Sequence, residues 1–239
     1  RVGFSAEANE TYYIAWDNLW DSRSFDFKLI ELDPDFLTSF SSESISSDGN
    51  DRGAVDMNGD FLDDILSVVS STKTIIINYQ QTDGSFIKAS YPSGGTYDPA
   101  WGIAAGDYDR NGYNDIVFGN NSGAHVVKAN DTGDGYSVAA TSESIFTQRS
   151  NFVDINNDGN LDIFICDDVE ANEYFINTGT ELELWEGDNP GTAENPNPIP
   201  NGLGLITGNY GSVWVDYDND RDLDLFIAKC GTGPINQLF

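Results

Sequence analysis

One acidic segment occurs four times in this chain, and it limits the possible folds more than any other feature. The copies read VDMNGDFLDDILSVV from Val55, GDYDRNGYNDIVFGN from Gly106, VDINNDGNLDIFICD from Val153 and VDYDNDRDLDLFIAK from Val215. Each copy has Asp or Asn at positions 1, 3, 5 and 9, counted from its first Asp, and a mostly apolar run follows at once. The first positions, 56, 107, 154 and 216, lie 51, 47 and 62 residues apart. A repeat of this length predicts similar structural units that pack against one another.

The residues around each acidic loop predict short antiparallel strands. The segments that precede the loops alternate in polarity; they are Arg52–Val55, Trp101–Ala105, Asn151–Val153 and Ser212–Val215. The runs that follow the loops, ILSVV, IVFG, IFIC and LFIA, are apolar at consecutive positions, which is typical of strands covered on both faces. Next come hairpin signals with a Gly turn in IIINYQQTDGSFI, VVKANDTGDGYSV and YFINTGTELEL.

These patterns predict an all-β fold, because each unit of about 50 residues holds roughly four strands and no credible helix. Four-stranded sheets repeated at this interval are typical of a β-propeller, and we expect residues 1–239 to form one such domain. The Pro-, Gly- and Asn-rich stretch at 187–204 predicts an inserted surface loop. The expected units are 1–50 (incomplete), 51–100, 101–148, 149–210 and 211–239 (incomplete).

The two ends of the chain are expected to lie inside repeats. The tetrapeptide SESI occurs at Ser42 and again at Ser142, shortly before the next acidic loop. This places Phe25–Phe40 as the outer hairpin of an earlier unit, and Asn236–Phe239 at the start of a third strand. Because the chain begins at Arg1 without Met, we expect a processed or trimmed product.

The spacing of the acidic loop suits a hard cation. Oxygens at positions 1, 3 and 5 of a tight turn converge, a carbonyl at position 7 adds a ligand, and the carboxylate at position 9 completes the shell. Calcium takes six to eight such oxygens in flexible geometry, whereas magnesium demands a strict octahedron and zinc or copper prefers N and S ligands. We therefore predict about four calcium ions. Their side-chain ligands would be Asp56, Asn58, Asp60, Asp64, Asp107, Asp109, Asn111, Asp115, Asp154, Asn156, Asp158, Asp162, Asp216, Asp218, Asp220 and Asp224.

Two other interpretations of the loops are an EF-hand and a simple backbone turn. An EF-hand needs Glu at position 12, which is here Ser67, Phe118, Ile165 and Ile227, and its flanks are helices. Turns in which Asp and Asn only cap the backbone would explain any single copy. Four copies in one register favour calcium.

The pattern D-x-[DN]-x-[DN]-G-x-x-D before an apolar strand resembles the FG-GAP/VCBS repeat, over about Ser42 to Phe239. The resemblance implies that each loop joins the first two strands of a blade, and that the carbonyls of Leu62, Tyr113, Asn160 and Asp222 bind calcium. Propellers of this family usually close with seven blades, so a chain with 4.5 to 5 units is expected to be part of a longer protein. Position 6, usually Gly, is Phe61 and Arg221 in the outer loops, which would weaken these sites if φ is positive there.

The phrases FVDINNDGNLDIFIC and VDYDNDRDLDLFIAKC look closest to exported VCBS-repeat proteins of Bacteroidota, near the ASPIC/UnbV group. Relatives of this kind are often cargo of type IX secretion. The resemblance thus implies a secreted or cell-surface protein, outside the bacterial outer membrane, whose partners include the secretion or adhesion machinery.

The charge of the chain excludes several partners. With 40 acidic and 11 basic residues the formal net charge is −29, which argues against nucleic acid and against anionic membranes. Four calcium ions would add eight positive charges and leave about −21. No run of 18 apolar residues occurs, so we expect no membrane insertion.

Few residues outside the loops suggest chemistry. His125 is the one histidine, no G-x-S-x-G motif accompanies it, and we expect it to be structural. Trp101 and Trp214 precede acidic loops and are expected to pack, whereas Trp16, Trp20 and Trp185 are candidates for ligand recognition. Cys166 and Cys230 have no metal or redox spacing, and free thiols are favoured over a disulfide.

Three functions follow from the sequence. The first is a non-catalytic, calcium-stabilised propeller for adhesion or protein interaction. The second is a carbohydrate-binding, lectin-like propeller that would use Trp16, Trp20 or Trp185. The third is a polysaccharide lyase or hydrolase, which the scarcity of Lys and Arg disfavours.

Overall fold

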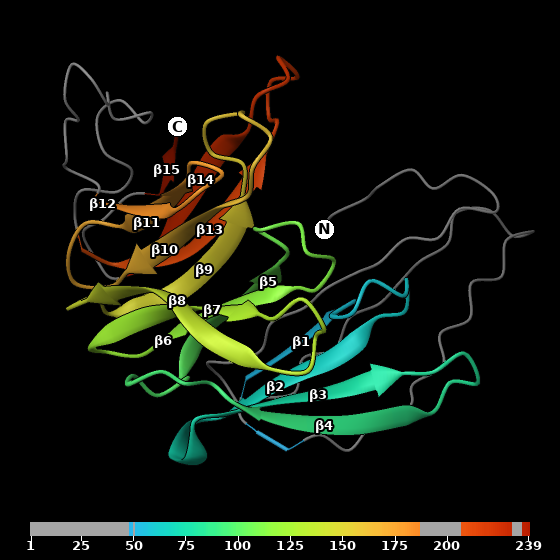
Figure 1. Cartoon of the computed structure of the whole chain (residues 1–239). Helices are drawn as coiled ribbons and strands as arrows, with labels where there is room; N and C mark the ends of the chain where they lie inside the picture. Colours follow the sequence, from blue (N-terminus) through green and yellow to red (C-terminus); the bar gives the residue numbers. More distant parts are fainter. Residues whose placement is uncertain (1–47, 50, 187–206, 231–235) are drawn as a thin grey trace, which may run out of the picture. The chain divides into compact units, whose positions relative to one another are not determined.

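The computed structural model describes residues 48–49, 51–186, 207–230 and 236–239, which form strands, turns and one short 3-10 helix (Figure 1). The hairpin expected at Phe25–Phe40, the loop expected at 187–204, and Trp16 and Trp20 lie outside the described residues. Within the described part, no helix is long and apolar enough to cross a membrane.

The described strands form four sheets, each made of strands that follow one another in the chain. The first sheet contains β1 (Asp51–Val55), β2 (Asp64–Val69), β3 (Thr74–Gln80) and β4 (Phe86–Pro92). The second contains β5 (Trp101–Gly106), β6 (Asp115–Gly119), β7 (Gly123–Ala129) and β8 (Tyr136–Glu143). The third contains β9 (Thr147–Val153), β10 (Asp162–Asp167), β11 (Glu173–Asn177) and β12 (Leu182–Glu186). The fourth contains β13 (Asn209–Val215), β14 (Asp224–Lys229) and β15 (Gln237–Leu238).

Within each sheet, every strand pairs antiparallel with the next strand of the chain, and the colours of Figure 1 follow this chain order. The all-β fold of consecutive four-stranded antiparallel sheets, the arrangement of propeller blades, is confirmed. The hairpins expected after the apolar strands are present as β3–β4, β7–β8 and β11–β12. In the first sheet a 3-10 turn, η1 (Ser70–Thr72), which the sequence pattern did not predict, links β2 to β3.

The second strand of each sheet lies at the centre of the packing. In the second sheet, Ile116 and Phe118 pack against Leu66 of the first sheet, and Val117 faces the opposite way, toward the third. The third sheet repeats this pattern, because Ile163 and Ile165 contact the second sheet whereas Phe164 and Cys166 contact the fourth. The first and third residues after the position-9 Asp thus face the preceding sheet, and the second faces the following one.

One expectation about these strands is wrong. β6 and β10 are buried along their whole length, as the continuous apolar pattern predicts. In β14, however, only Leu225 and Ile227 are buried, and Phe226 is 38% exposed. The reason is that, among the described residues, no sheet lies on the face of β14 to which Phe226 belongs.

Candidate metal centres

Each acidic loop joins the first and second strands of one sheet, as the family resemblance implied. The loops connect β1 to β2, β5 to β6, β9 to β10 and β13 to β14. Position 9 is the first residue of the second strand in all four copies, at Asp64, Asp115, Asp162 and Asp224. The strand therefore fixes the carboxylate of position 9, while the turn places the other oxygens near it.

The carboxylate at position 9 holds three parts of the sheet together. In the second loop, Asp115 accepts one hydrogen bond from the N–H of Tyr108 (3.0 Å) and another from the N–H of Ala129 in β7 (2.8 Å). Asp64 and Asp162 make the same pair of bonds, each at 2.8 Å. Asp224 accepts the first of these bonds, from the N–H of Tyr217 at 2.7 Å. Position 9 thus links the loop to the third strand.

Burial makes these carboxylates electrostatically costly when no cation is bound. The side chains of Asp64, Asp115 and Asp162 are fully buried. Burial raises the pKa of Asp115 to about 7 and that of Asp162 to about 6, although the two backbone N–H groups oppose the shift, and burial also raises the pKa of Asp64. The neighbouring loop carboxylates add to this rise by repulsion. A bound cation would reverse the balance by favouring the ionised form.

Positions 1 and 5 organise the turn itself. Asp107 accepts hydrogen bonds from the N–H groups of Asn111 (3.0 Å) and Gly112 (2.9 Å). The side-chain oxygen of Asn111, at position 5, accepts from the N–H of Tyr113 at position 7 (2.8 Å). Equivalent bonds occur in the other three loops. The four copies therefore share one backbone conformation.

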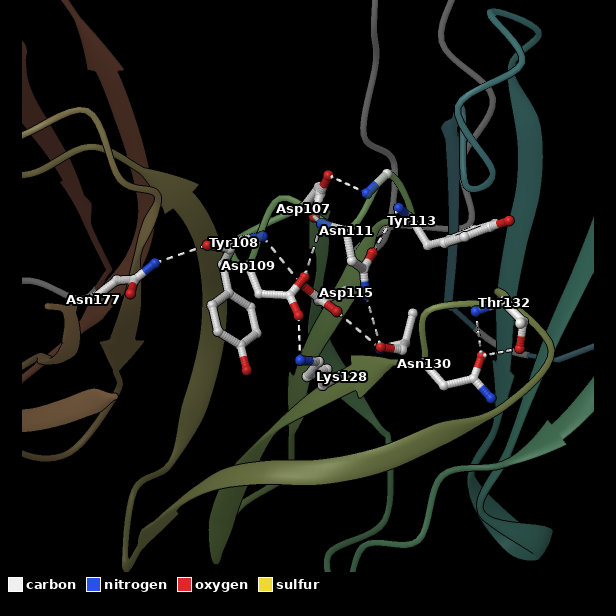
Figure 2. A network of polar contacts seen from close by, with 12 residues as sticks. Asp107, Tyr108, Asp109, Asn111, Tyr113, Asp115, Lys128, Asn130, Thr132 and Asn177 are labelled. Carbon is white, nitrogen blue, oxygen red and sulfur yellow. Dashed lines mark hydrogen bonds and ion pairs between the residues drawn. The ribbon is translucent and has the colours of Figure 1, made fainter. Parts of the chain in front are cut away.

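The carboxylates at positions 1, 3 and 9 converge. In the second loop, Asp107, Asp109 and Asp115 each place one oxygen within 4.8 Å of the others, and Asp216, Asp218 and Asp224 do the same in the fourth loop (Figure 2 shows the second loop). In the first and third loops position 3 is Asn58 and Asn156, whose side-chain oxygens accept from the N–H groups of Asp60 and Asp158 at position 5. Position 5 does not belong to the converging carboxylates in the fourth loop, because Asp220 accepts from the N–H of Asp222.

The backbone at position 6 has positive φ in every loop, which confirms the concern raised by the two non-Gly residues. The angles are 90° at Gly112 and 89° at Gly159, and 67° at Phe61 and 80° at Arg221. A side chain with a Cβ is strained in this region by roughly 1–2 kcal/mol. Phe61 gains no compensating contact, because its side chain is 94% exposed.

Replacing Phe61 with glycine is therefore expected to stabilise the protein. The expected gain in the free energy of unfolding is about 0.5–1 kcal/mol, since relief of strain exceeds the entropy that glycine adds to the unfolded chain. Urea denaturation in EDTA would measure the gain without a contribution from metal. The reverse change, Gly112→Ala, should destabilise by about 1 kcal/mol. A destabilised Phe61→Gly would contradict the strain argument.

The donor set fits calcium better than other cations. The side chains at positions 1, 3, 5 and 9 all offer oxygen, and the buried position-9 carboxylate of the first three loops leaves one lone pair free on each oxygen after its two backbone bonds. The residues that would hold calcium are those predicted from the sequence at positions 1, 3 and 9. The ligand role of the carbonyls of Leu62, Tyr113, Asn160 and Asp222, and of the position-5 side chains, stays a prediction.

Several polar side chains that the sequence did not single out connect the loops to other parts of the protein. Asn114, at position 8 of the second loop, donates from Nδ2 to the carbonyl of Asp56 in the first loop (2.7 Å). Asn177 donates to the carbonyl of Tyr108 (2.8 Å), which ties the third sheet to the second loop (Figure 2). Lys128 forms an ion pair with Asp109. A signal was available for Asn114, since the other loops have Asp or Leu at position 8.

The three tryptophans in the described residues contribute to packing. Trp101 stacks on Phe146 with ring centroids 5.4 Å apart, and Trp214 meets Phe164 edge-to-face at 5.4 Å. Trp185, which the sequence suggested for recognition, is 6% exposed and stacks against Tyr174 within the core of the third sheet. Its ring faces protein atoms on β11, so little of it is free to stack on a ligand.

His125 is buried and fully engaged in hydrogen bonds. Its Nε2 accepts from the N–H groups of Thr96 (2.9 Å) and Tyr97 (3.0 Å), so the ring proton belongs on Nδ1, which lies 2.9 Å from Thr141 Oγ1. Burial lowers the pKa of His125. These contacts give it a structural role. Cys166 and Cys230 are both free thiols, and Cys166 is buried.

A groove of about 590 Å³ opens between the third and fourth sheets. Its walls come from β9 and β13 and from the ends of their acidic loops. The lining includes Trp214, Asn151, Ser212 and Asp154. Phe152 also borders the groove, but its ring packs on the opposite face of β9, beside Gly106 of the second sheet.

The family comparison agrees with this geometry. A family model described as an FG-GAP-like repeat matches residues 56–118 and 154–227, which include all four acidic loops. A search of solved structures finds an Agrocybe aegerita lectin, described by its recognition of non-reducing terminal N-acetylglucosamine, with 14% identity and a TM-score of 0.48. The match covers 79% of this chain and 51% of the lectin chain, so this chain spans about half of that length. No curated protein matches.

Proposed function

Because the chain belongs to the family of FG-GAP-like repeat proteins, we propose that it is a non-catalytic calcium-binding module that engages a protein or a surface glycan outside the cell. The observation that carries the proposal is the shared geometry of the four loops. In each, a carboxylate at the start of the second strand accepts from the N–H of position 2, and in the second and fourth loops it converges with the carboxylates of positions 1 and 3. Calcium there would link the turn, the second strand and the third strand.

The expected role of calcium is to stabilise the sheets that present a binding surface. Without a cation, burial opposes the ionisation of Asp115 and Asp162, and the other carboxylates of the same loop add repulsion. Calcium that binds only the folded state adds stability by mass action, about 2.7 kcal/mol per site at a hundred times the dissociation constant. An extracellular location, where calcium is abundant, suits such a design. The likeness to exported proteins of Bacteroidota supports the same location.

The test is thermal unfolding with EDTA, followed by titration of the stripped protein with calcium and with magnesium. We expect EDTA to lower the melting temperature by at least about 10 °C, because several sites each contribute a few kcal/mol. Calcium should restore the melting temperature with more than one equivalent bound, and magnesium should do so poorly. No change on chelation would mean that the loops are only backbone turns.

Carbohydrate binding is the second candidate, and the groove between β9 and β13 favours it. Its aromatic side chain, Trp214, lies beside the polar side chains of Asn151 and Ser212, a combination that suits the apolar face and the hydroxyls of a sugar. A glycan array probed with the calcium-loaded protein would test this. Binding that Trp214→Ala abolishes, with Trp101→Ala as the control, would support it, whereas an array without signal would leave protein interaction as the function.

A further inference from the structure

The second loop differs from the first and third in having a lysine that pairs with one of its carboxylates. Lys128, in β7, forms an ion pair with Asp109, which occupies position 3 of the loop (Figure 2). The next residue, Ala129, donates the hydrogen bond that the position-9 carboxylate of Asp115 receives from the third strand. Lys128 is therefore attached to the strand that closes the candidate calcium site.

The copies of the loop lack this lysine. The residues whose N–H groups bind Asp64 and Asp162 from the third strand are Gln80 and Asn177. The residues that precede them, which correspond to Lys128, are Tyr79 and Ile176. Both are uncharged at neutral pH. The ammonium group thus distinguishes the second loop from the first and third.

The ammonium group occupies a carboxylate oxygen that a cation would need. One oxygen of Asp109 already accepts from the N–H of Asn111 (3.2 Å), and the other pairs with Lys128. Asp109 is well sheltered, with 17% of its side chain exposed, whereas 37% of the lysine side chain is exposed. The lysine can therefore swing into solvent without opening the core, but Asp109 stays beside Asp107 and Asp115.

We propose that Lys128 is a built-in counter-ion of the second loop, which holds Asp109 in the absence of calcium and which calcium must displace, so that this site binds calcium more weakly than its geometry alone would allow. The inference rests on the proposed function. The ammonium group competes with the ion for Asp109, and it also repels a divalent ion held by the same carboxylates. At a separation of a few ångströms in a water-like dielectric, this repulsion corresponds to a factor on the order of ten in affinity.

The experiment compares wild type, Lys128→Met, Lys128→Arg and the control Lys88→Met, all stripped of metal. Lys88 is an exposed lysine in β4 that pairs with Asp48, away from the loops. Calcium alone is titrated by calorimetry, and melting temperatures are measured in EDTA and in saturating calcium.

We expect Lys128→Met to change the melting temperature in opposite directions in EDTA and in saturating calcium. Its melting temperature should fall below that of wild type in EDTA, because Asp109 loses its counter-ion, and should rise above it in calcium. One binding step should tighten about tenfold or more. Lys128→Arg should behave like wild type because it keeps the charge. Lys88→Met should leave calcium binding unchanged and should not shift the melting temperature in opposite directions in EDTA and in calcium.

Three results would overturn the inference. Calcium affinities of Lys128→Met within twofold of wild type would show that the lysine does not compete. A lower melting temperature in both conditions, without tighter binding, would make Lys128 a structural residue only. The absence of calcium binding in wild type and variants alike would instead reject the proposed function, and the competition with it, so the two failures can be told apart.

Discussion

Replacing Asp115 with alanine is expected to lower the free energy of unfolding by about 2–4 kcal/mol even in EDTA. The carboxylate is buried, and it accepts from the N–H groups of Tyr108 and Ala129. Alanine would leave both donors without an acceptor, and a buried unsatisfied donor costs about 1–3 kcal/mol. Urea denaturation of wild type and variant in EDTA would measure the loss, which does not depend on whether the loop binds metal.

Asparagine at the same position separates the structural role of Asp115 from its role toward calcium. Asp115→Asn keeps the shape and one acceptor and removes the buried charge, so its stability in EDTA should lie within about 1 kcal/mol of wild type. In saturating calcium the free energy of unfolding of Asp115→Asn should be lower than that of wild type by about 2–3 kcal/mol, because one site no longer binds calcium. Equal stabilities in calcium would exclude Asp115 as a ligand.

The pH dependence of the free energy of unfolding is a second measurement that distinguishes wild type from Asp115→Asn. The pKa of Asp115 is raised to about 7 and that of Asp162 to about 6 in the folded protein, from 3.8. Between about pH 4 and 7 the folded state therefore binds more protons than the unfolded state, and the stability of the calcium-free protein should fall as the pH rises. Asp115→Asn should lose part of this slope. In calcium the ionised carboxylates are favoured, and the slope should flatten.

Phe164→Ala is expected to destabilise the protein by about 3–5 kcal/mol, whereas Phe226→Ala should cost less than about 1 kcal/mol. Both residues occupy the second position after the position-9 Asp of their repeats. Phe164 is fully buried between the third and fourth sheets, but Phe226 is 38% exposed. The two variants therefore change the same residue in the same local structure, and they differ in the sheet that covers it.

Chemical denaturation in saturating calcium would measure both changes. The m-value should stay constant if each variant alters only the folded state. A cost at Phe226 as large as that at Phe164 would show that this face of the fourth sheet is covered in solution.

The repeat made the fold predictable, because it fixes loop, strand and hairpin in four copies at once. The boundaries of β2, β6, β10 and β14 follow from the position-9 Asp that begins each of them. The exposure of Phe226 was not predictable from the sequence. The hydrophobic pattern of a strand indicates which side chains can be buried, but it does not indicate whether a neighbouring sheet is present to cover them. The same limit applies to Trp185, whose irregular surroundings in the sequence suggested a surface that the packing against Tyr174 removes.

The candidate sites were predictable only in part. Spacing identified the oxygens at positions 1, 3 and 9, since these belong to one short segment. Lys128 and Asn177 come from the third strand of a sheet, and Asn114 acts on the loop of the preceding sheet. Contacts between segments so far apart in the chain depend on register, which a single sequence does not give for side chains that lack a repeated counterpart.

The alternation of faces along the second strands has a consequence for how mutations combine. Leu66 shares a cluster with Phe118, and Val117 shares one with Ile165, but no cluster of the described residues contains side chains from sheets that are not consecutive. Energetic coupling should therefore extend to the adjacent sheet and stop there, as in a linear array with nearest-neighbour terms. Double-mutant cycles across one interface should show interaction energies, and cycles that skip a sheet should be additive. Variation in one repeat can then be tolerated or compensated by its neighbours alone.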